Sequence, residues 1–439
     1  MQEVTKVEID VPVWAQGGRI NEREFYLQFS RKHNLAWMNG CFFGEQGMVP
    51  EEQVRKWVFD MLENYFCFDL VPKTNKLLEA MKLYYQKENL INDSSQVCIH
   101  VANGTYLLMK EELSDAMYPC RCRLPVRYNP GAPRPVRWLK FLSQLLYPED
   151  IPTLQEYMGY CLVPVNYAQK MLLILGKGGE GKSRIGIVLH ALMGDAMCNG
   201  SLLKLENSQF ARADLQNRLL MVDDDLQLAA LKTTGYLKTI ITAEQPLDLE
   251  RKGEQSYQGR VYCRLMAFGN GNLQSLYDRS HGFFRRQIIL TTRDRPMDRV
   301  DDPFLADRLK QETEGILLWA LEGLRRLTEN NMCFTISTRA RWNLDEAVLE
   351  GNNILAFLSS EGYIRFGQNT MITSRRLYSV YTEWCDDNMM VPLTSKSFSS
   401  WIISNCGRLN ITYAHDIPGG SGRMVRGFRG ITTALGWGK

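Results

Sequence analysis

The 439-residue sequence predicts an α/β core, with a mixed α+β domain before it and a domain of helices and a β-hairpin after it. Strand-like apolar runs at 171–175, 218–225 and 263–268 each end at glycine, acidic or amide residues. Apolar residues at helical spacing follow the first run, which is typical of an alternating α/β sheet. We therefore expect three domains, at residues 1–145, 146–332 and 333–439.

Composition excludes several classes of protein. The chain is 45% hydrophobic and 23% charged, as ordinary globular proteins are. Its net charge of +3 is too small to imply a nucleic-acid partner by itself. Its 11 cysteines and five histidines show no metal-ligand spacing. No apolar stretch approaches the roughly 20 residues of a membrane span, and no signal peptide is evident. We expect a cytoplasmic protein without a membrane partner.

The N-terminal third reads as small elements separated by turns. Residues 1–24 are polar, and we interpret them as a tether despite Trp14. The arginine- and proline-rich stretch 121–137 suits a solvated connector better than a DNA contact. Patterning predicts hairpins at 36–49 and 97–109, and helices at 51–66, 77–85, 139–147 and 154–162.

The first core strand leads into a glycine loop that predicts a nucleotide site. Gly176, Gly181, Lys182 and Ser183 satisfy G-x-x-x-x-G-K-[ST], in which backbone N–H groups and the lysine bind phosphates and the hydroxyl ligates Mg²⁺. A turn that binds nothing is disfavoured, because strand, loop, Lys-Ser pair and helix coincide. The predicted cofactors are ATP and Mg²⁺, and the predicted contacts are Gly176, Lys177, Gly178, Gly179, Glu180, Gly181, Lys182 and Ser183.

Acidic residues end the second core strand, about 40 residues later, at Asp223, Asp224 and Asp225. One acid at such a position can hold Mg²⁺, usually through water, while another orients the attacking water. The residues leave the division of roles open. We favour Asp223 for the metal, together with Ser183, and Asp224 for the water.

Two further candidates flank the last core strands. Asn270 follows the third strand and can position the water, although Asn272 remains an alternative and both could simply form a turn. Arg286 precedes the last strand, where it could act as an arginine finger, a device that contributes about 10³–10⁵ in rate in related enzymes. The alternative for Arg286 is a basic pair, with Arg285, that merely caps the strand.

Residues 247–262 alternate like two strands around a turn at Gly253. Arg251 and Lys252 near the tip could contact DNA phosphates, and Tyr257 could stack on a base. In the alternative interpretation, Tyr257 packs on the base of the hairpin and Lys252 pairs with a neighbouring acid.

The pattern of elements in the C-terminal domain predicts a winged helix. Helices near 344–360, 374–387 and 395–406 precede a hairpin at 411–432. Residues 396–439 hold six basic residues against the single acid Asp416, a net charge of +5. Arg423, Arg426 and Arg429 are therefore candidate DNA contacts, with a solvated basic face as the alternative.

Taken in order, these motifs resemble the superfamily III helicases of the phage and plasmid primase-helicase type, related to the poxvirus primase-helicase. The resemblance covers about residues 36–330. It rests on the loop at 176–183, the acids at 223–225, the segment 250–252, the strand ending at Asn270 and the run 282–286, with similar segments upstream at 101–104, 128–130 and 154–160.

The resemblance implies an AAA+ ATPase fold and an ATP-dependent replicative DNA helicase of a phage, plasmid or other mobile element. It also implies a hexameric ring on single-stranded and forked DNA, with Arg286 as the finger, and a separate primase or replication protein as a further partner. The sequence departs from the family in showing no primase signature before residue 145, and in lacking a proline after Asn270. An origin-binding protein that does not unwind DNA and a P-loop switch ATPase remain alternatives.

Overall fold

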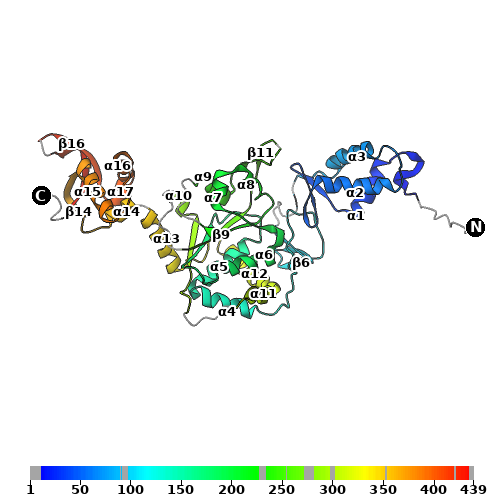
Figure 1. The fold of residues 1–439 in the computed structure, drawn as a ribbon, viewed down its shortest axis with the longest axis horizontal. Helices are drawn as coiled ribbons and strands as arrows, with labels where there is room; N and C mark the ends of the chain where they lie inside the picture. The colour runs from blue at the N-terminus through cyan, green and yellow to red at the C-terminus, as the bar shows by residue number, and fades with distance from the viewer. Residues whose placement is uncertain are drawn as a thin grey trace, which may run out of the picture. The chain divides into compact units, whose positions relative to one another are not determined.

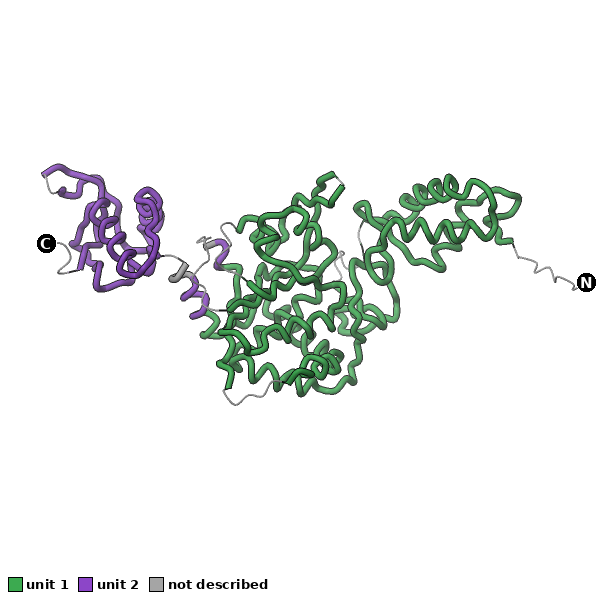
Figure 2. Tube along the Cα trace, in the orientation of Figure 1, with its two compact units in different colours: residues 1–227, 233–271, 285–341 green, residues 228–232, 272–284, 342–439 purple. Residues whose placement is uncertain are grey.

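The computed structural model describes residues 11–88, 90, 97–226, 234–253, 255–270, 281–296, 302–351, 353–419 and 422–434 (Figure 1). The chain divides into two compact units (Figure 2). The first holds residues 1–227, 233–271 and 285–341, and the second holds residues 228–232, 272–284 and 342–439. Within the described ranges, every helix is too short or too polar to cross a membrane.

The first unit begins with a helical lobe around a small antiparallel sheet, β1-β2-β3. Its elements are η1 (Val13–Gly18), α1 (Glu22–Lys32), β1 (Ala36–Met38), β2 (Cys41–Gly44), β3 (Gly47–Val49), α2 (Glu51–Glu63) and α3 (Leu70–Tyr84). Trp14 is 1% exposed, and its ring packs edge-on against Phe25 and Tyr65 at centroid distances of 5.1 and 5.3 Å. The expectation of a tether is therefore wrong for the described part of residues 1–24, because η1 folds an aromatic anchor into the core of the lobe.

A second small sheet confirms the hairpin predicted at 97–109. It is formed by β4 (Cys98–Val101), β5 (Gly104–Leu107) and β6 (Glu112–Ser114). Arg123, from the segment interpreted as a solvated connector, is 6% exposed and donates hydrogen bonds to the carbonyls of Val101 and Gly104 at 2.8 and 2.7 Å. That interpretation is wrong at Arg123, because its guanidinium satisfies carbonyls at the β4–β5 turn.

A five-stranded parallel sheet forms the centre of the first unit, in agreement with the predicted α/β core. Its order is β13-β7-β12-β9-β8. The strands are β7 (Met171–Gly176), β8 (Met197–Asn199), β9 (Leu220–Leu226), β12 (Arg264–Asn270) and β13 (Gln287–Thr291). Because parallel strands share one carboxyl edge, the glycine loop, the acids and Asn270 gather at the same end of the sheet.

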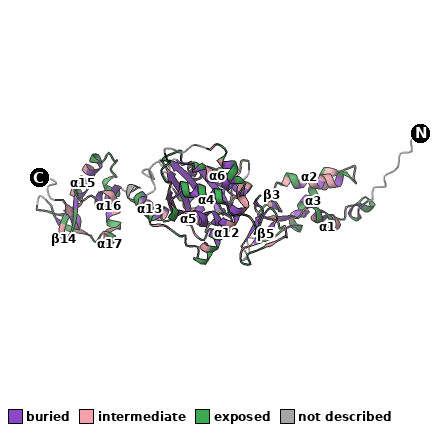
Figure 3. Ribbon diagram, turned by 90° about the horizontal axis from the view of Figure 1, so that it is seen from below, coloured by how far each residue is buried: buried purple, intermediate pink, exposed green. Residues whose placement is uncertain are grey.

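Both faces of the sheet are buried, as parallel sheets require, and buried residues are concentrated in the part of the chain around α5, α6 and α12 (Figure 3). Leu172 and Ile174 join the core formed with α5, α6 and α12, while Leu173, which points to the other face, is 1% exposed. The helices are α4 (Val136–Leu145), η3 (Pro148–Asp150), α5 (Ile151–Tyr160), α6 (Ser183–Met193), η4 (Gly194–Ala196), α7 (Leu202–Asn207), α8 (Gln209–Ala213), α9 (Gly235–Thr242), α11 (Leu305–Lys310) and α12 (Thr313–Glu329).

The main core reaches upstream of the sheet. Ile99, Leu124 and Trp138 belong to the same cluster of buried side chains as the sheet residues. The boundary expected between residues 145 and 146 therefore lies inside one hydrophobic core, and α4 packs with the central sheet through Trp138.

The predicted hairpin at 247–262 is present as two short antiparallel strands, β10 (Leu247–Leu249) and β11 (Tyr257–Gly259). Gly253 lies at its turn with a φ of +84°. In this left-handed region glycine carries no steric penalty.

The second unit contains a three-stranded antiparallel sheet with the order β14-β16-β15, packed on helices. The elements are α10 (His281–Phe284), α14 (Asn353–Leu358), β14 (Ile364–Thr373), α15 (Ser374–Asp387), α16 (Ser395–Ser404), α17 (Cys406–Leu409), β15 (Thr412–Pro418) and β16 (Met424–Thr433). Helix α13 (Thr338–Gly351) begins in the first unit. The expected hairpin is present, but β14 was not predicted, because only Ile364 and Ile372 near its ends are buried.

Candidate nucleotide-binding and catalytic site

The glycine loop lies between β7 and α6, where the sequence motif predicts it. Gly178 and Gly181 have φ angles of +105° and +107°, which strain any residue with a side chain. At Gly176 a Cβ would come within 2.8 Å of the Lys182 Nζ atom. The glycines therefore let the backbone fold tightly around the lysine.

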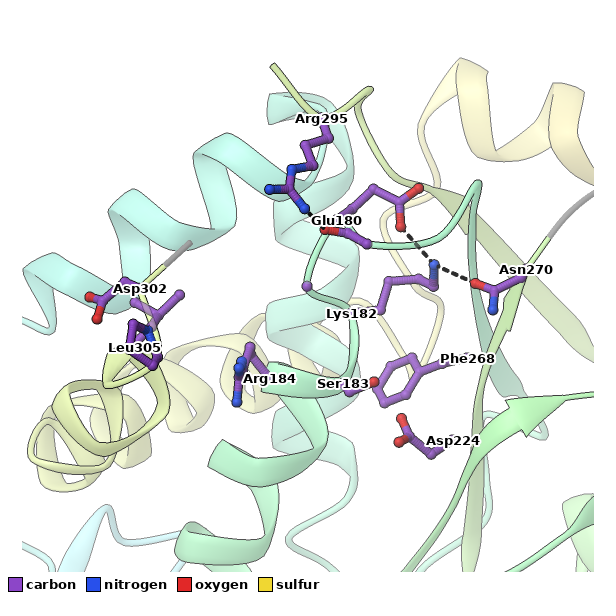
Figure 4. Close-up of a pocket in the computed structure, with 13 residues that line it drawn as sticks. Glu180, Lys182, Ser183, Arg184, Asp224, Phe268, Asn270, Arg295, Asp302 and Leu305 are labelled. Carbon is purple, nitrogen blue, oxygen red and sulfur yellow. Dashed lines mark hydrogen bonds and ion pairs between the residues drawn. The ribbon is translucent and has the colours of Figure 1, made fainter. Parts of the chain in front are cut away.

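Lys182 and Glu180 form a buried pair inside this loop (Figure 4). The Lys182 Nζ atom donates to Glu180 Oε2 at 2.9 Å and to Asn270 Oδ1 at 3.1 Å. The Glu180 carboxylate also accepts from the backbone N–H groups of Lys177 and Gly178, the latter at 2.8 Å. Burial acts to raise the pKa of Glu180, but the Lys182 side chain and the backbone donors outweigh it, so the pKa lies below its ordinary value.

The loop thus already holds an anion, which is the chain's own carboxylate. Backbone N–H groups and a lysine ammonium that converge on one anion form the kind of cradle that binds phosphate in P-loops. Glu180 Oε1 and Oε2 stand in for phosphate oxygens there, and the residues present fit a nucleotide polyphosphate.

A pocket of about 660 Å³ opens beside the loop. Ser183, Asp224 and Lys182 all line this pocket, and Figure 4 shows the three side chains. Asp223 is only 5% exposed, and its Oδ2 atom accepts a hydrogen bond from the backbone N–H of Leu202 at 2.8 Å. The structure therefore places Asp224 on the pocket wall with Ser183, while Asp223, the acid favoured for the metal, is hydrogen-bonded to Leu202.

The physical reason is strand alternation. Asp223 and Asp224 are successive residues of β9 and point to opposite sides, so only one of these two can face the loop. The register of β9 with β12 shifts after Asp223, and both Asp224 and Asp225 are exposed. Burial raises the pKa of Asp223, although hydrogen bonds from Leu202 and Asp225 N–H groups oppose this shift. Asp223 fastens the start of α7, and Asp224 is the acid that faces the pocket.

Asn270 lies where the sequence predicts it, at the carboxyl end of β12 and opposite Gly176 in the register of β12 and β7. Its side-chain oxygen accepts from Lys182, so the amide contacts the Lys182–Glu180 pair of the loop. The alternative candidate, Asn272, lies outside the described residues.

The structure does not bring Arg286 into this pocket. The backbone N–H of Met171, at the start of β7, donates to the Arg286 carbonyl at 2.8 Å. The loop follows the other end of β7, six residues further on, a distance of about 20 Å at roughly 3.3 Å per residue. Burial lowers the pKa of Arg286 and neighbouring Arg285 adds to this, while Glu244 opposes it.

The candidate DNA-binding residues differ in how they are held. Tyr257 and Arg251 both donate to Gln216 Oε1, at 2.6 and 2.8 Å, so their side chains are fixed against the body of the unit. The Tyr257 hydroxyl is thus hydrogen-bonded to a residue outside the hairpin. Lys252, next to the turn, is exposed.

In the second unit, Arg423 and Arg426 are exposed beside the turn between β15 and β16 and on β16. Arg429 forms an ion pair with Asp416 at 2.6 Å. This pairing offsets part of the positive charge that the sequence places on the hairpin.

Sequence reasoning missed part of the pocket wall. Arg295, Asp302 and Leu305 line the pocket with the loop residues. They follow the last strand of the sheet in a stretch without any recognised motif, so no sequence signal pointed to them.

Comparisons with known proteins bear on the fold. A family described as a family of unknown function (DUF5906) matches residues 174–286. The apo structure of the NrS-1 C-terminal region is similar with a TM-score of 0.51 and 13% identity, covering 96% of this chain and 100% of that chain. An A-form apo structure of the same region gives 0.51 and 12%, covering 92% and 98%. A comparison with curated proteins finds no match. These likenesses show a shared fold.

Proposed function

We propose that this chain is a Mg²⁺-dependent ATPase of the AAA+ type that acts as a replicative DNA helicase of a phage, plasmid or other mobile element. One observation carries the ATPase part. Lys182, Ser183, Asp224 and Asn270 converge at the carboxyl edge of a parallel sheet, around a loop that already holds an anion. The helicase part is supported by the order and compact spacing of the motifs along the sequence.

Each residue has a role that its position supports. Lys182 binds phosphate oxygens once a nucleotide displaces Glu180, and Ser183 and Asp224 are the residues that would hold Mg²⁺. The metal supplies positive charge against the phosphates. The Asn270 amide, held beside Lys182, orients the attacking water.

We further propose a ring, most simply a hexamer, in which Arg286 acts on the nucleotide of the neighbouring subunit. Its position at the amino edge of the sheet supports this proposal, because the side chain is too far from its own loop. A single subunit cannot then complete its own site.

For the DNA track we propose single-stranded and forked DNA, gripped by Lys252 at the tip of the β10–β11 hairpin. Arg251 and Tyr257 position the hairpin through Gln216, and Lys252 is an exposed cation at its tip. Arg423 and Arg426 supply a second basic surface, and a separate primase or replication protein completes the proposed partners.

The first experiment measures ATP hydrolysis and unwinding of a forked duplex by wild type and by Lys182→Ala. Wild type should hydrolyse ATP, accelerate with single-stranded DNA and separate the strands, and Lys182→Ala should lose hydrolysis and unwinding. Lys204→Ala, which removes an exposed lysine on α7, is the matched control and should behave as wild type.

Three outcomes would contradict part of this proposal. Hydrolysis at the wild-type rate by Lys182→Ala would remove the assigned site. A hydrolysis rate that single-stranded DNA does not change would indicate a switch ATPase. Duplex binding without strand separation would indicate an origin-binding protein.

A further inference from the structure

The segment that follows β13 lies against the phosphate loop. The Thr292 backbone N–H donates to the carbonyl of Leu175, near the end of β7, at 2.8 Å. Asp294 forms an ion pair with Lys177 of the loop at 2.7 Å. Residues 292–295 therefore extend the sheet edge beyond β13 and lie beside the loop.

Arg295 is the member of this segment that enters the pocket. Its Nη1 atom lies 3.4 Å from the carbonyl oxygen of Gly179, and it lines the pocket with Lys182 and Ser183. Figure 4 shows its side chain beside the loop, close to Glu180. A hydrogen bond of 3.4 Å to a neutral carbonyl is long and weak.

A polyphosphate would be a stronger partner for this side chain. A guanidinium carries five N–H donors in a planar fork that matches phosphate oxygens, and charge-assisted hydrogen bonds are about twice as strong as neutral ones. The charge in the pocket favours this partner too, because Glu180 already offsets the Lys182 ammonium. When a nucleotide displaces Glu180, Arg295 stands next to the incoming negative charge.

We propose that Arg295 binds the polyphosphate of the nucleotide held in its own subunit. The inference rests on the proposed function, which supplies the nucleotide. It also gives β13 a second role, because the strand carries Arg286 at its amino end and the Arg295 segment just beyond its carboxyl end. One strand then contacts two nucleotides, its own through Arg295 and its neighbour's through Arg286.

The first test is the affinity for a non-hydrolysable ATP analogue, measured by calorimetry. Arg295→Ala should bind about 10- to 100-fold more weakly than wild type, as expected when a hydrogen bond to a charged group is removed. Arg295→Lys should recover part of the affinity, since it keeps the charge and loses the fork. Thermal unfolding of each variant checks that the fold is intact.

Arg293→Ala is the matched control, because Arg293 belongs to the same segment but donates to the carbonyl of Ser143 at 2.8 Å and does not line the pocket. It should bind the analogue as wild type does. If Lys182→Ala loses binding while Arg295→Ala binds as tightly as wild type, the inference is wrong and the proposed site survives. If wild type itself binds no nucleotide, the proposed function fails with it.

The second test separates action within a subunit from action between subunits. At an ATP concentration too low for Arg295→Ala alone to bind it, mixing Arg295→Ala with Arg286→Ala should restore hydrolysis, because an intact loop with Arg295 then meets an intact finger at some interfaces. Mixing Arg295→Ala with Lys182→Ala should restore none, because no subunit then carries both Lys182 and Arg295. Recovery in the second mixture would overturn the inference and make Arg295 a residue donated to the neighbour.

Discussion

Glu180 is an acid inside the glycine loop, and its carboxylate occupies donors that the proposed nucleotide would need. It accepts from Lys182, Gly178 and Lys177, and its side chain is 4% exposed. The negative charge must leave this cradle before a phosphate enters. The loop sequence therefore provides both the binding groups and a competitor for them.

We predict that Glu180→Gln binds ATP more tightly than wild type at neutral pH. A neutral amide competes less well for Lys182 than a carboxylate does, and the gain should be about tenfold if one charge-assisted hydrogen bond is weakened. Titration with a fluorescent ATP analogue measures the effect. Weaker binding by Glu180→Gln would show that Glu180 helps to bind the nucleotide instead.

The two neighbouring acids on β9 should respond differently to removal. Asp224→Ala should reduce Mg²⁺-dependent hydrolysis about a hundredfold or more without loss of stability, since metal ligation contributes several kcal/mol to this chemistry. Asp223→Ala should lower the free energy of unfolding by about 1–3 kcal/mol, because the Leu202 N–H loses its partner.

Urea unfolding and steady-state hydrolysis, measured on both variants, compare the two acids. The opposite pattern, with Asp224→Ala destabilised and still active, would return the metal to Asp223.

At the scale of elements, four strands of the central sheet (β7, β9, β12 and β13) and most helices follow from sequence periodicity, whereas β8 and β14 do not. Buried parallel strands are uniformly apolar and end at polar residues, so their limits are visible in the sequence. Only two of the ten residues of β14 are buried, and its pairing partner β16 lies about 60 residues further along the chain. A strand that is held mainly by pairing with a distant segment need not show a local alternation of apolar and polar residues, so its sequence does not reveal it.

The β10–β11 hairpin is the element proposed to hold DNA. Lys252→Ala should weaken single-strand binding, lower the slope of log K against log salt by about 1, and abolish unwinding while basal hydrolysis continues. Fluorescence anisotropy at several salt concentrations measures this slope. Lys204→Ala, with an exposed lysine removed elsewhere in the same unit, should leave the slope as it is.

Unchanged unwinding and an unchanged salt dependence of DNA binding in Lys252→Ala would show that the hairpin does not hold the DNA. The exposed arginines Arg423 and Arg426 of the second unit would then be the better candidates for the main DNA contact.

At the scale of the whole molecule, a ring explains why the proposed site is divided between two edges of one sheet. Mixing Arg286→Ala protein with Lys182→Ala protein should restore part of the hydrolysis that each lacks alone, because intact loops meet intact fingers at mixed interfaces. Steady-state assays over a range of mixing ratios measure the recovery. Absence of recovery at every ratio would show that Arg286 does not act across subunits.

The sequence by itself determined the positions of the glycine loop, the strand-end acids and Asn270, because a motif of contiguous residues encodes its own local backbone and strands end where apolar runs end. Only the tertiary structure decided which acid faces the loop, that Arg295 joins it, and that Trp14 is an anchor. These answers depend on which face of a strand a side chain occupies and on which distant segments the strand order brings together. Local patterns do not specify those relations, because packing between distant segments fixes them.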